Sequence, residues 1–223
     1  KHRLTYTALT LISGWLRKKT PDIQYRYAHK LAQLFYNHLV IRQKEARKNI
    51  AIAFPRYSEL RRELILKNSY IFFIRNTMQF LSFPRSFQDA DITVNGKEYL
   101  DEALAKKRGV ILVTGHFGVW EIMLAWFGLN RYSMLAVGQK QKNSGADIFV
   151  NQLRENAWIK MIPRKSSLEF MYEALASNRI LTLASDQDAK KRGIFVKFFS
   201  LPASTPKGAA RFHLECGSPL IFV

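Results

Sequence analysis

Apolar residues recur at helical spacing through the first third of the chain. The spacing predicts helices over residues 4–17, 21–40 and 59–83. Thr20, Pro21 and Asp22 open the second of these as a cap, a first helical position and a first-turn acid. We therefore expect an N-terminal helical preface before any sheet begins.

Short apolar runs rich in β-branched residues replace that pattern farther along the chain. Helical patterns separate most of these runs, and this alternation predicts an α/β fold with a mixed, largely parallel sheet flanked by helices. The expected strands are residues 92–94, 110–114, 133–137, 158–162, 180–184, 194–198 and 220–223.

The change of pattern also suggests a division of the chain. Residues 1–91 are expected to form basic amphipathic helices, a membrane-facing part of the same domain. Residues 92–223 are expected to form the α/β core. Because the chain stops on the apolar run 220–223, we expect this core to be truncated at its C-terminus.

The segment from Gly115 to Glu121 carries the clearest candidate chemistry. His116 follows a predicted strand, and the carboxyl ends of strands in open α/β sheets are where ligands bind. Glu121, in the first turn of the next helix, could fold back onto one ring nitrogen and leave the other to take a proton. The plainer interpretation, which spacing alone favours, is a strand-end histidine and an acid placed by the helix dipole.

Polar residues follow two other predicted strands at the same edge. Arg164 comes just after strand 158–162, where its guanidinium could grip a phosphate. Asp186, Gln187 and Asp188 follow strand 180–184 and could orient sugar hydroxyls or Arg164. The alternatives are a surface arginine and an ordinary turn cluster.

The net positive charge of the chain restricts the kinds of partner that it can bind. The chain has 35 Lys and Arg against 17 Asp and Glu, a net charge of +18, and residues 1–91 hold 17 of the cations but 6 of the anions. Such a chain attracts phosphate in membranes, nucleotides or nucleic acid. The single Cys216 excludes an internal disulfide framework and suggests a reducing compartment. No apolar run approaches the roughly 20 residues that span a bilayer.

The motif Gly115-His116-Phe117-Gly118-Val119-Trp120-Glu121 resembles the H-x4-D/E motif of the bacterial lipid A biosynthesis acyltransferases. These late lauroyl and myristoyl transferases belong to the wider lysophospholipid acyltransferase group. Further segments recur in the family's order: 46–55, 162–164, 183–188, 193–199 and 202–205. The chain departs from the family pattern at Val119, at Gln139-Lys140, at Ala157 and at Ser200.

The resemblance implies a membrane-associated O-acyltransferase. It would move a fatty acyl chain from a thioester, on acyl carrier protein or CoA, to a hydroxyl of a lipid A precursor in lipopolysaccharide biosynthesis. Its place would be the cytoplasmic face of the bacterial inner membrane, held peripherally or by a segment outside this chain. No cofactor and no metal are implied.

The resemblance also implies roles for particular residues. His116 and Glu121 would be catalytic, and amides from Gly115 to Gly118 would stabilise the oxyanion. Substrate would be bound by Arg164, Asp186, Gln187, Asp188, Gly118 and Lys140.

Two alternatives stay open. One is an acyltransferase acting on another glycolipid, such as a phosphoinositol mannoside or an aminolipid. The other is a nonenzymatic basic protein binding membranes or nucleic acid, although the chain shows no nucleic-acid-binding motif.

Lys190, Lys191 and Arg192 could meet lipid phosphate or an acidic carrier. Phe195, Phe198 and Phe199 are expected either in the core or along an acyl channel.

Overall fold

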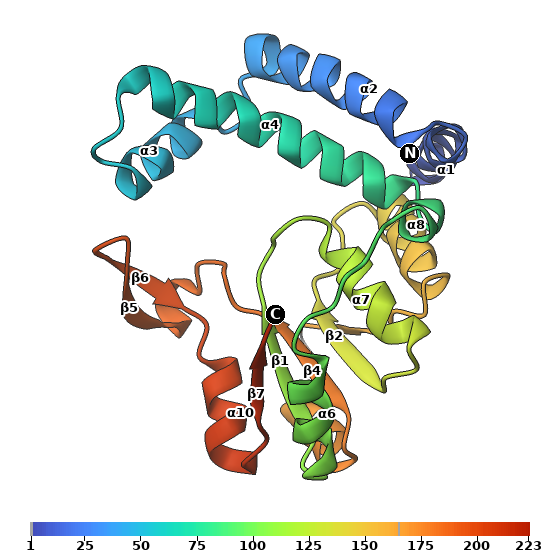
Figure 1. Cartoon of the computed structure of the whole chain (residues 1–223), viewed down its shortest axis with the longest axis vertical. Coiled ribbons are helices and arrows are strands. Elements are labelled where there is room, and N and C mark those ends of the chain that lie inside the picture. The colour runs from blue at the N-terminus through green and yellow to red at the C-terminus, as the bar shows by residue number, and fades with distance from the viewer. Residues whose placement is uncertain (1, 165) are drawn as a thin grey trace. The chain divides into compact units, whose positions relative to one another are not determined.

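The computed structural model describes residues 2–164 and 166–223, which pack as two compact units (Figure 1). One unit is Leu11–Ser86, and the other is Phe87–Val223 with the first turns of helix α1(His2–Arg17). The boundary between the units therefore falls inside α1 and again near residue 86. The membrane-facing role expected for residues 1–91 stays a prediction.

The Leu11–Ser86 unit is helical. It contains the end of α1, α2(Pro21–Leu34), α3(Gln43–Ala53) and α4(Glu59–Leu81), and the short α5(Arg85–Gln88) begins at its boundary. Ser58 caps α4 by accepting from the Arg61 backbone amide at 3.3 Å. The core between α2 and α4 is built on Ala28, Ala32 and Ile74.

Two details of this unit differ from the sequence-based expectation. The helix predicted over 21–40 leaves α-helical geometry at Leu34, passes through a π-helical turn, Phe35–Leu39, and ends at left-handed Val40. Helix α3 was not expected. None of the helices in the described ranges combines the length and the apolarity needed to cross a bilayer.

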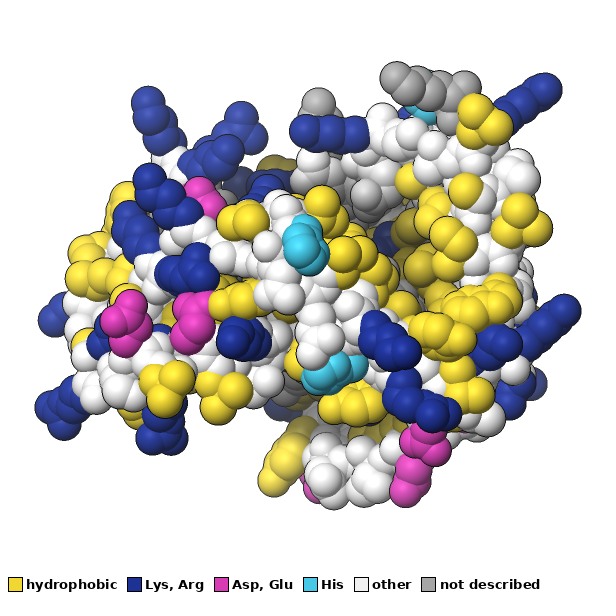
Figure 2. All heavy atoms as spheres, turned by 90° about the horizontal axis from the view of Figure 1, so that it is seen from above, with side chains coloured by type: hydrophobic (Ala, Val, Ile, Leu, Met, Phe, Trp, Pro, Cys, Tyr) yellow, Lys and Arg dark blue, Asp and Glu magenta, His cyan; other side chains and the backbone are white. Residues whose placement is uncertain are grey.

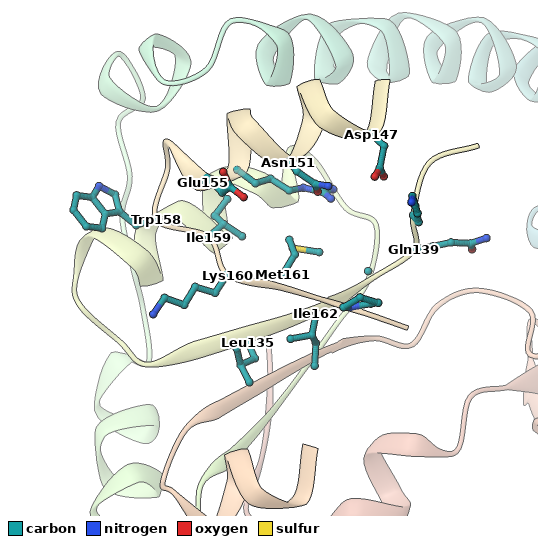
Figure 3. Close-up of a pocket in the computed structure, with 14 residues that line it drawn as sticks. Leu135, Gln139, Asp147, Asn151, Glu155, Trp158, Ile159, Lys160, Met161 and Ile162 are labelled. Atoms are coloured by element: carbon teal, nitrogen blue, oxygen red, sulfur yellow. The ribbon is translucent and has the colours of Figure 1, made fainter. Parts of the chain in front are cut away.

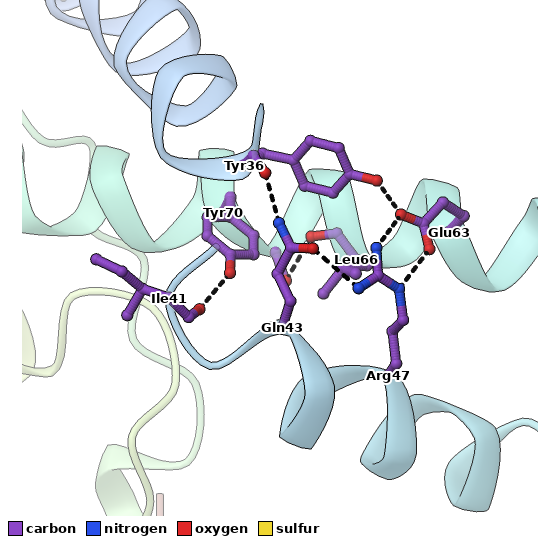
Figure 4. A network of polar contacts seen from close by, with 8 residues as sticks. Tyr36, Ile41, Gln43, Arg47, Glu63, Leu66 and Tyr70 are labelled. Carbon is purple, nitrogen blue, oxygen red and sulfur yellow. Dashed lines mark hydrogen bonds and ion pairs between the residues drawn. The ribbon is translucent and has the colours of Figure 1, made fainter. Parts of the chain in front are cut away.

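A polar network joins α3 to α4 in this unit (Figure 4). The Arg47 guanidinium donates to both Glu63 oxygens, at 3.1 and 2.9 Å, and to Gln43 Oε1 at 2.9 Å. The Tyr36 hydroxyl also donates to Glu63. A bidentate fork of this kind adds a geometrically specific contact between the two helices, so Arg47, part of the basic segment 46–55, has a structural role here.

The other unit is built on a five-stranded parallel sheet with strand order β3-β2-β4-β1-β7. The strands are β1(Val110–Thr114), β2(Met134–Gly138), β3(Met161–Pro163), β4(Ile180–Ala184) and β7(Leu220–Phe222). The helices between them are α7(Trp120–Leu129), α8(Ser144–Glu155), α9(Leu168–Ala176) and α10(Gly208–Cys216), with α6(Lys97–Ala105) ahead of β1. The predicted α/β class with a largely parallel sheet is confirmed.

Both faces of the sheet are apolar because its strands are covered by helices. Ile111, Leu135 and Leu181 point to the side on which α9 and α10 contribute Leu175 and Phe212. Val110 and Leu112 alternate with Ile111 and are equally buried, while α6 and α7 pack against β1 and β2. This packing holds the carboxyl ends of β1 and β4 rigidly side by side.

The strand predictions differ from the structure in three places. The strand expected over 158–162 is shortened to Met161–Pro163. Residues 92–94 form no strand, because no neighbouring strand pairs with them in the part of the chain that the structure describes. Residues 194–198 do form β5(Ile194–Phe198), but it pairs with β6(Leu201–Thr205) in a separate antiparallel hairpin and not with the main sheet. The reason is the two-residue connection between them, which only an antiparallel partner allows.

Candidate active site

His116 lies in the turn that leads from β1 into α7. Strand β1 ends at Thr114. The turn begins at Gly115, and α7 begins five residues later at Trp120. Gly118 has a left-handed backbone with φ of +52°, a conformation that a side chain makes costly. This glycine therefore serves to fold the motif segment, and its role in substrate binding stays a prediction.

The carboxylate that holds His116 belongs to Asp186. His116 Nδ1 lies 2.9 Å from Asp186 Oδ1, and the His116 backbone amide donates to Asp186 Oδ2 at 2.9 Å. The register of the two strands explains this contact. Thr114 pairs with Ala184, and His116 and Asp186 each lie two residues after the end of their strand. The edge of the imidazole also meets the Trp120 ring, with centroids 4.8 Å apart and planes at 74°.

This pairing keeps Asp186 ionised. Partial burial acts to raise the pKa of Asp186, but the hydrogen bonds from the His116 amide and ring, with the imidazolium charge, outweigh it. The net result is a pKa for Asp186 below its ordinary value. An ionised Asp186 that accepts from Nδ1–H leaves His116 Nε2 as the ring nitrogen that can take a proton.

Glu121 has a different partner from the one expected. Its carboxylate accepts from Arg154 Nη2 at 3.2 Å, and its side chain is only 4% exposed. The predicted fold-back of Glu121 onto His116 is corrected by this contact, because the first turn of α7 directs Glu121 inward while Asp186 reaches the imidazole from β4. The catalytic assignment of Glu121 stays a prediction, without the orienting role.

Burial dominates the electrostatics of Glu121. Desolvation raises the pKa of Glu121 above its ordinary value, and the charge and hydrogen bond of Arg154 reduce the shift without removing it. Arg154 lies in the last turn of α8, a position that a helix dipole favours for a cation. The pair thus ties the first turn of α7 to the end of α8.

A pocket of about 680 Å³, lined in part by Arg154, lies between α8 and strands β2 and β3 (Figure 3). In the close-up Met161 is central and Trp158 stands at the edge of the group. Lys140, Arg154 and Lys160 bring positive charge to its lining, while Asp147 and Glu155 bring negative charge. The pocket is large enough for part of a lipid or a thioester donor.

The remaining predicted residues are placed as follows. Lys140 lines the pocket just beyond β2. Arg164 is exposed after β3, three strands from β1, so the two backbones are roughly 14 Å apart along the expected edge. Asp188 accepts from the Lys190 amide at 2.8 Å and supports a local turn, and Gln187 is exposed.

One part of the expected oxyanion site is already occupied. The His116 amide donates to Asp186, so it does not point at a reacting carbonyl. That part of the prediction is corrected. Within residues 2–164 and 166–223, no three His, Cys, Asp or Glu side chains are grouped as a metal site.

Comparison with known proteins agrees with the motif. The chain matches the family described as bacterial lipid A biosynthesis acyltransferase over residues 2–223. It belongs to this family. The resemblance seen in the motifs is thereby confirmed.

Several relatives can be compared by length and identity. Phosphatidylinositol mannoside acyltransferase of Mycobacterium tuberculosis is 27% identical over 135 residues, which is 59% of this chain and 43% of that protein. The protein of the same name from Mycolicibacterium smegmatis is 26% identical over 127 residues, covering 55% and 42%. Lipid A biosynthesis lauroyltransferase of Escherichia coli is 27% identical over 99% of this chain and 74% of its own length. The matches span less than half the length of the mycobacterial relatives.

The role of Arg154 was not predicted from the sequence, and Asp186 was expected to bind substrate. Arg154 lies 33 positions from Glu121 and reads as an ordinary cation at a helix end. For Asp186 a signal existed, because His116 and Asp186 stand at the same offset from two predicted strands. Using that signal required knowing that β1 and β4 are neighbours.

Proposed function

We propose that this protein is an O-acyltransferase that moves a fatty acyl chain from a thioester to a hydroxyl of a lipid A precursor. The observation that carries the proposal is the contact between His116 Nδ1 and Asp186 at the carboxyl edge of a parallel sheet. A histidine held in this way has one free nitrogen and a carboxylate to stabilise its charged form. Family membership supports the reaction class.

The reaction needs one base and no covalent enzyme intermediate. His116 Nε2 takes the proton of the acceptor hydroxyl as its oxygen attacks the thioester carbonyl carbon. The tetrahedral intermediate then expels the thiolate as the C–S bond breaks, and His116 returns the proton to sulfur. Asp186 stabilises the imidazolium between the two steps, as in other base–carboxylate pairs.

The Glu121–Arg154 pair has a positioning role in this mechanism. Because Glu121 is buried on Arg154 and Asp186 holds the ring, Glu121 does not share the proton of His116. The pair fixes the start of α7, which follows the catalytic turn directly. Arg154 and Lys140 also bring positive charge to the neighbouring pocket, where a phosphate-bearing donor or acceptor would bind.

The donor we propose is acyl carrier protein or CoA carrying the acyl group, and the acceptor is an anionic glycolipid in the membrane. The net charge of +18 suits each of these anionic partners. The site of action would be the cytoplasmic face of a bacterial inner membrane, reached peripherally or through an anchor outside this chain.

A second acceptor is favoured by a specific observation. Two mycobacterial proteins named phosphatidylinositol mannoside acyltransferase match 59% and 55% of this chain. A mannosylated phosphoinositide presents hydroxyls near a phosphate, as lipid A precursors do, so the same His116–Asp186 pair would serve either acceptor.

The test is a transfer assay with the purified protein. Acyl carrier protein and CoA thioesters are each combined with a lipid A precursor or a phosphoinositol mannoside, and products are weighed by mass spectrometry. We expect one added acyl chain, lost in His116→Ala and kept in His38→Ala, which changes an exposed histidine in the helical unit. Equal activity of His116→Ala and wild type would refute the mechanism. Transfer to the mannoside alone would select the second acceptor.

A further inference from the structure

The β5–β6 hairpin is open to solvent on both sides. Its strands pair in antiparallel register from Ile194–Thr205 to Phe198–Leu201, and it stands apart from the five-stranded sheet in Figure 1. Successive residues of a strand point to opposite faces, yet every residue of β5 is exposed. β5 therefore buries neither face against the core of its own unit, and β6 is half-buried only from Ala203 to Thr205.

Large apolar side chains fill these open faces. Phe195 is 71% exposed, Phe198 64% and Phe199 51%, and Ile194 and Leu201 are each 48% exposed. The expectation that these phenylalanines lie in the core is wrong, and the alternative of an acyl channel stays a prediction. Clustered apolar exposure of this kind marks an interaction surface, since a hairpin this apolar and unpaired is otherwise an aggregation hazard.

The tip keeps an aromatic residue where the backbone disfavours one. Phe199 and Ser200 both have left-handed backbones, with φ of 48° and 63°, in a two-residue turn that normally selects asparagine and glycine. A left-handed residue with a side chain costs about 1–2 kcal/mol. Phe199 instead packs edge-on against Phe198, with centroids 4.6 Å apart, so two rings share the tip.

Positive charge is concentrated at the other end of the hairpin, and Lys197 within β5 adds one more exposed cation whose long side chain can reach the headgroups from beside the tip. Lys190, Lys191 and Arg192 form a 3-10 turn directly before β5, and all three are exposed. The turn is fixed to the hairpin, because Ser204 Oγ donates to the Lys190 carbonyl at 2.5 Å. Gly193 allows this approach, since a Cβ there would lie 2.4 Å from Ser204 Oγ.

Aromatic residues at a tip and cations at a base are what an anionic bilayer surface binds. Rings enter the boundary between headgroups and acyl chains, while lysine and arginine remain with the lipid phosphates. The dimensions fit: five residues of β-strand span about 17 Å, and interfacial segments bury roughly 5–10 Å. The tip rings can insert while the basic turn stays at headgroup depth.

We propose that the β5–β6 hairpin is a membrane anchor that inserts its tip rings, Phe198 and Phe199, into an anionic lipid leaflet. Charge complementarity with Lys190, Lys191 and Arg192 selects lipid as the occupant. The basic turn begins four residues after Asp186, so the anchor brings the His116–Asp186 pair to the surface where a lipid acceptor lies. That consequence rests on the proposed function, whereas the lipid contact itself does not.

The first test is sedimentation of the whole chain with vesicles of phosphatidylcholine, with or without phosphatidylglycerol, and without donor or acceptor. Phe198→Ser/Phe199→Ser should weaken binding to the anionic vesicles about tenfold or more. Leu214→Ser is the matched control, because Leu214 is 82% exposed on α10 and outside the hairpin. Unchanged binding of the double variant would overturn the proposal, as would no binding of wild type.

The second test separates the basic turn from general charge. Lys190→Ala/Lys191→Ala should lower affinity for the anionic vesicles roughly 30-fold, because each lysine makes about one electrostatic contact with the lipid surface. Lys106→Ala/Lys107→Ala removes the same charge from exposed residues after α6 and should lower it much less. Equal losses in the two pairs would contradict a localised anchor.

A local probe shows which part of the chain enters lipid. Cys216 is the only cysteine, so Cys216→Ser combined with Phe199→Cys accepts one environment-sensitive dye at the tip. Its emission should shift to the blue and brighten with anionic vesicles, while a dye on Leu214→Cys should not respond. A silent tip probe on sedimenting protein would refute insertion. A tip probe that responds to protein concentration without lipid would instead assign the surface to a second copy.

The outcomes of the lipid-binding tests are independent of acyl transfer. Lipid binding that depends on the hairpin, with no acyl transfer in any assay, would keep the anchor and refute the proposed function. Transfer to a detergent-dispersed acceptor, with no vesicle binding, would keep the function and refute the anchor.

Discussion

At the scale of single residues, His116 is held through its ring nitrogen and its own backbone amide by one carboxylate. Asp186 thereby sets both the orientation of the imidazole and the place where the turn crosses the sheet edge. Trp120 closes the remaining side of the ring. A base restrained by three contacts needs little rearrangement when substrate arrives.

Replacing Asp186 by asparagine tests this arrangement. Asp186→Asn keeps the size of the side chain but removes the charge that stabilises the imidazolium, so kcat should fall by about 10²- to 10⁴-fold. Steady-state kinetics on the identified donor and acceptor measure it. Asp91→Asn is the control, since it removes the same charge from an exposed side chain outside the predicted site. A small effect at Asp186 would contradict its role.

The burial of Glu121 predicts a pH dependence of stability. Its folded-state pKa is raised above the ordinary 4.5, so the stability that it contributes is complete below that value and is lost as pH rises through the raised pKa. Glu121→Gln does not titrate and can still accept from Arg154. The free energies of unfolding of wild type and of this variant are measured in urea. The wild-type value should therefore fall relative to that of the variant as pH rises from 4.5. A relative gain over that range would show the opposite shift.

At the scale of elements, tight backbone contacts place the strands that carry the site. Gly109 enters β1 with φ of +64°, and a Cβ there would lie 2.5 Å from the Leu175 carbonyl oxygen and 2.7 Å from Leu175 Cα. Both obstacles are backbone atoms of α9, which no side-chain rotation can relieve. This contact holds the start of β1 against the end of α9.

Substitution of Gly109 should therefore be costly. Gly109→Ala combines a left-handed alanine with a backbone clash and should lower the free energy of unfolding by at least about 2 kcal/mol. Gly208→Ala, at the first position of α10, has open space around its Cβ and should have little effect. Thermal and urea unfolding of both variants measure the difference. Similar stabilities would show that the chain relaxes around Gly109.

At the scale of the whole molecule, charge is the dominant property. Figure 2 shows Lys and Arg side chains over much of the visible face, with few Asp and Glu among them. The net charge of +18 acts over a distance that salt shortens to about 10 Å at 0.1 M. Long-range attraction therefore affects association with an acidic partner more than the chemistry at His116.

The donor can be identified through this property. If the donor is an acidic carrier protein, kcat/KM should fall at least about tenfold between low salt and 0.3 M, because many exposed charges are screened together. The smaller charge of a CoA thioester should give a shallower fall with the same acceptor. Initial rates with both donors across a salt series provide the comparison. A rate with carrier protein that ignores salt would contradict this donor.

The amino-acid sequence by itself determined the local elements and the chemistry that they carry. The apolar runs 110–114 and 180–184 became β1 and β4 with unchanged boundaries, and the alternation of strands and helices led to a parallel sheet. These features depend on residue periodicity within a few positions, which a chain displays before it folds. The motif around His116 is local for the same reason.

Only the tertiary structure decided which of these elements meet. The neighbouring positions of β1 and β4 made Asp186 the partner of His116, and the packing of α7 gave Glu121 to Arg154 instead. The pattern of β5 resembled a core strand, yet it pairs only with β6. Strand order and helix packing depend on contacts between residues far apart in the chain, whose energies no short window of sequence contains.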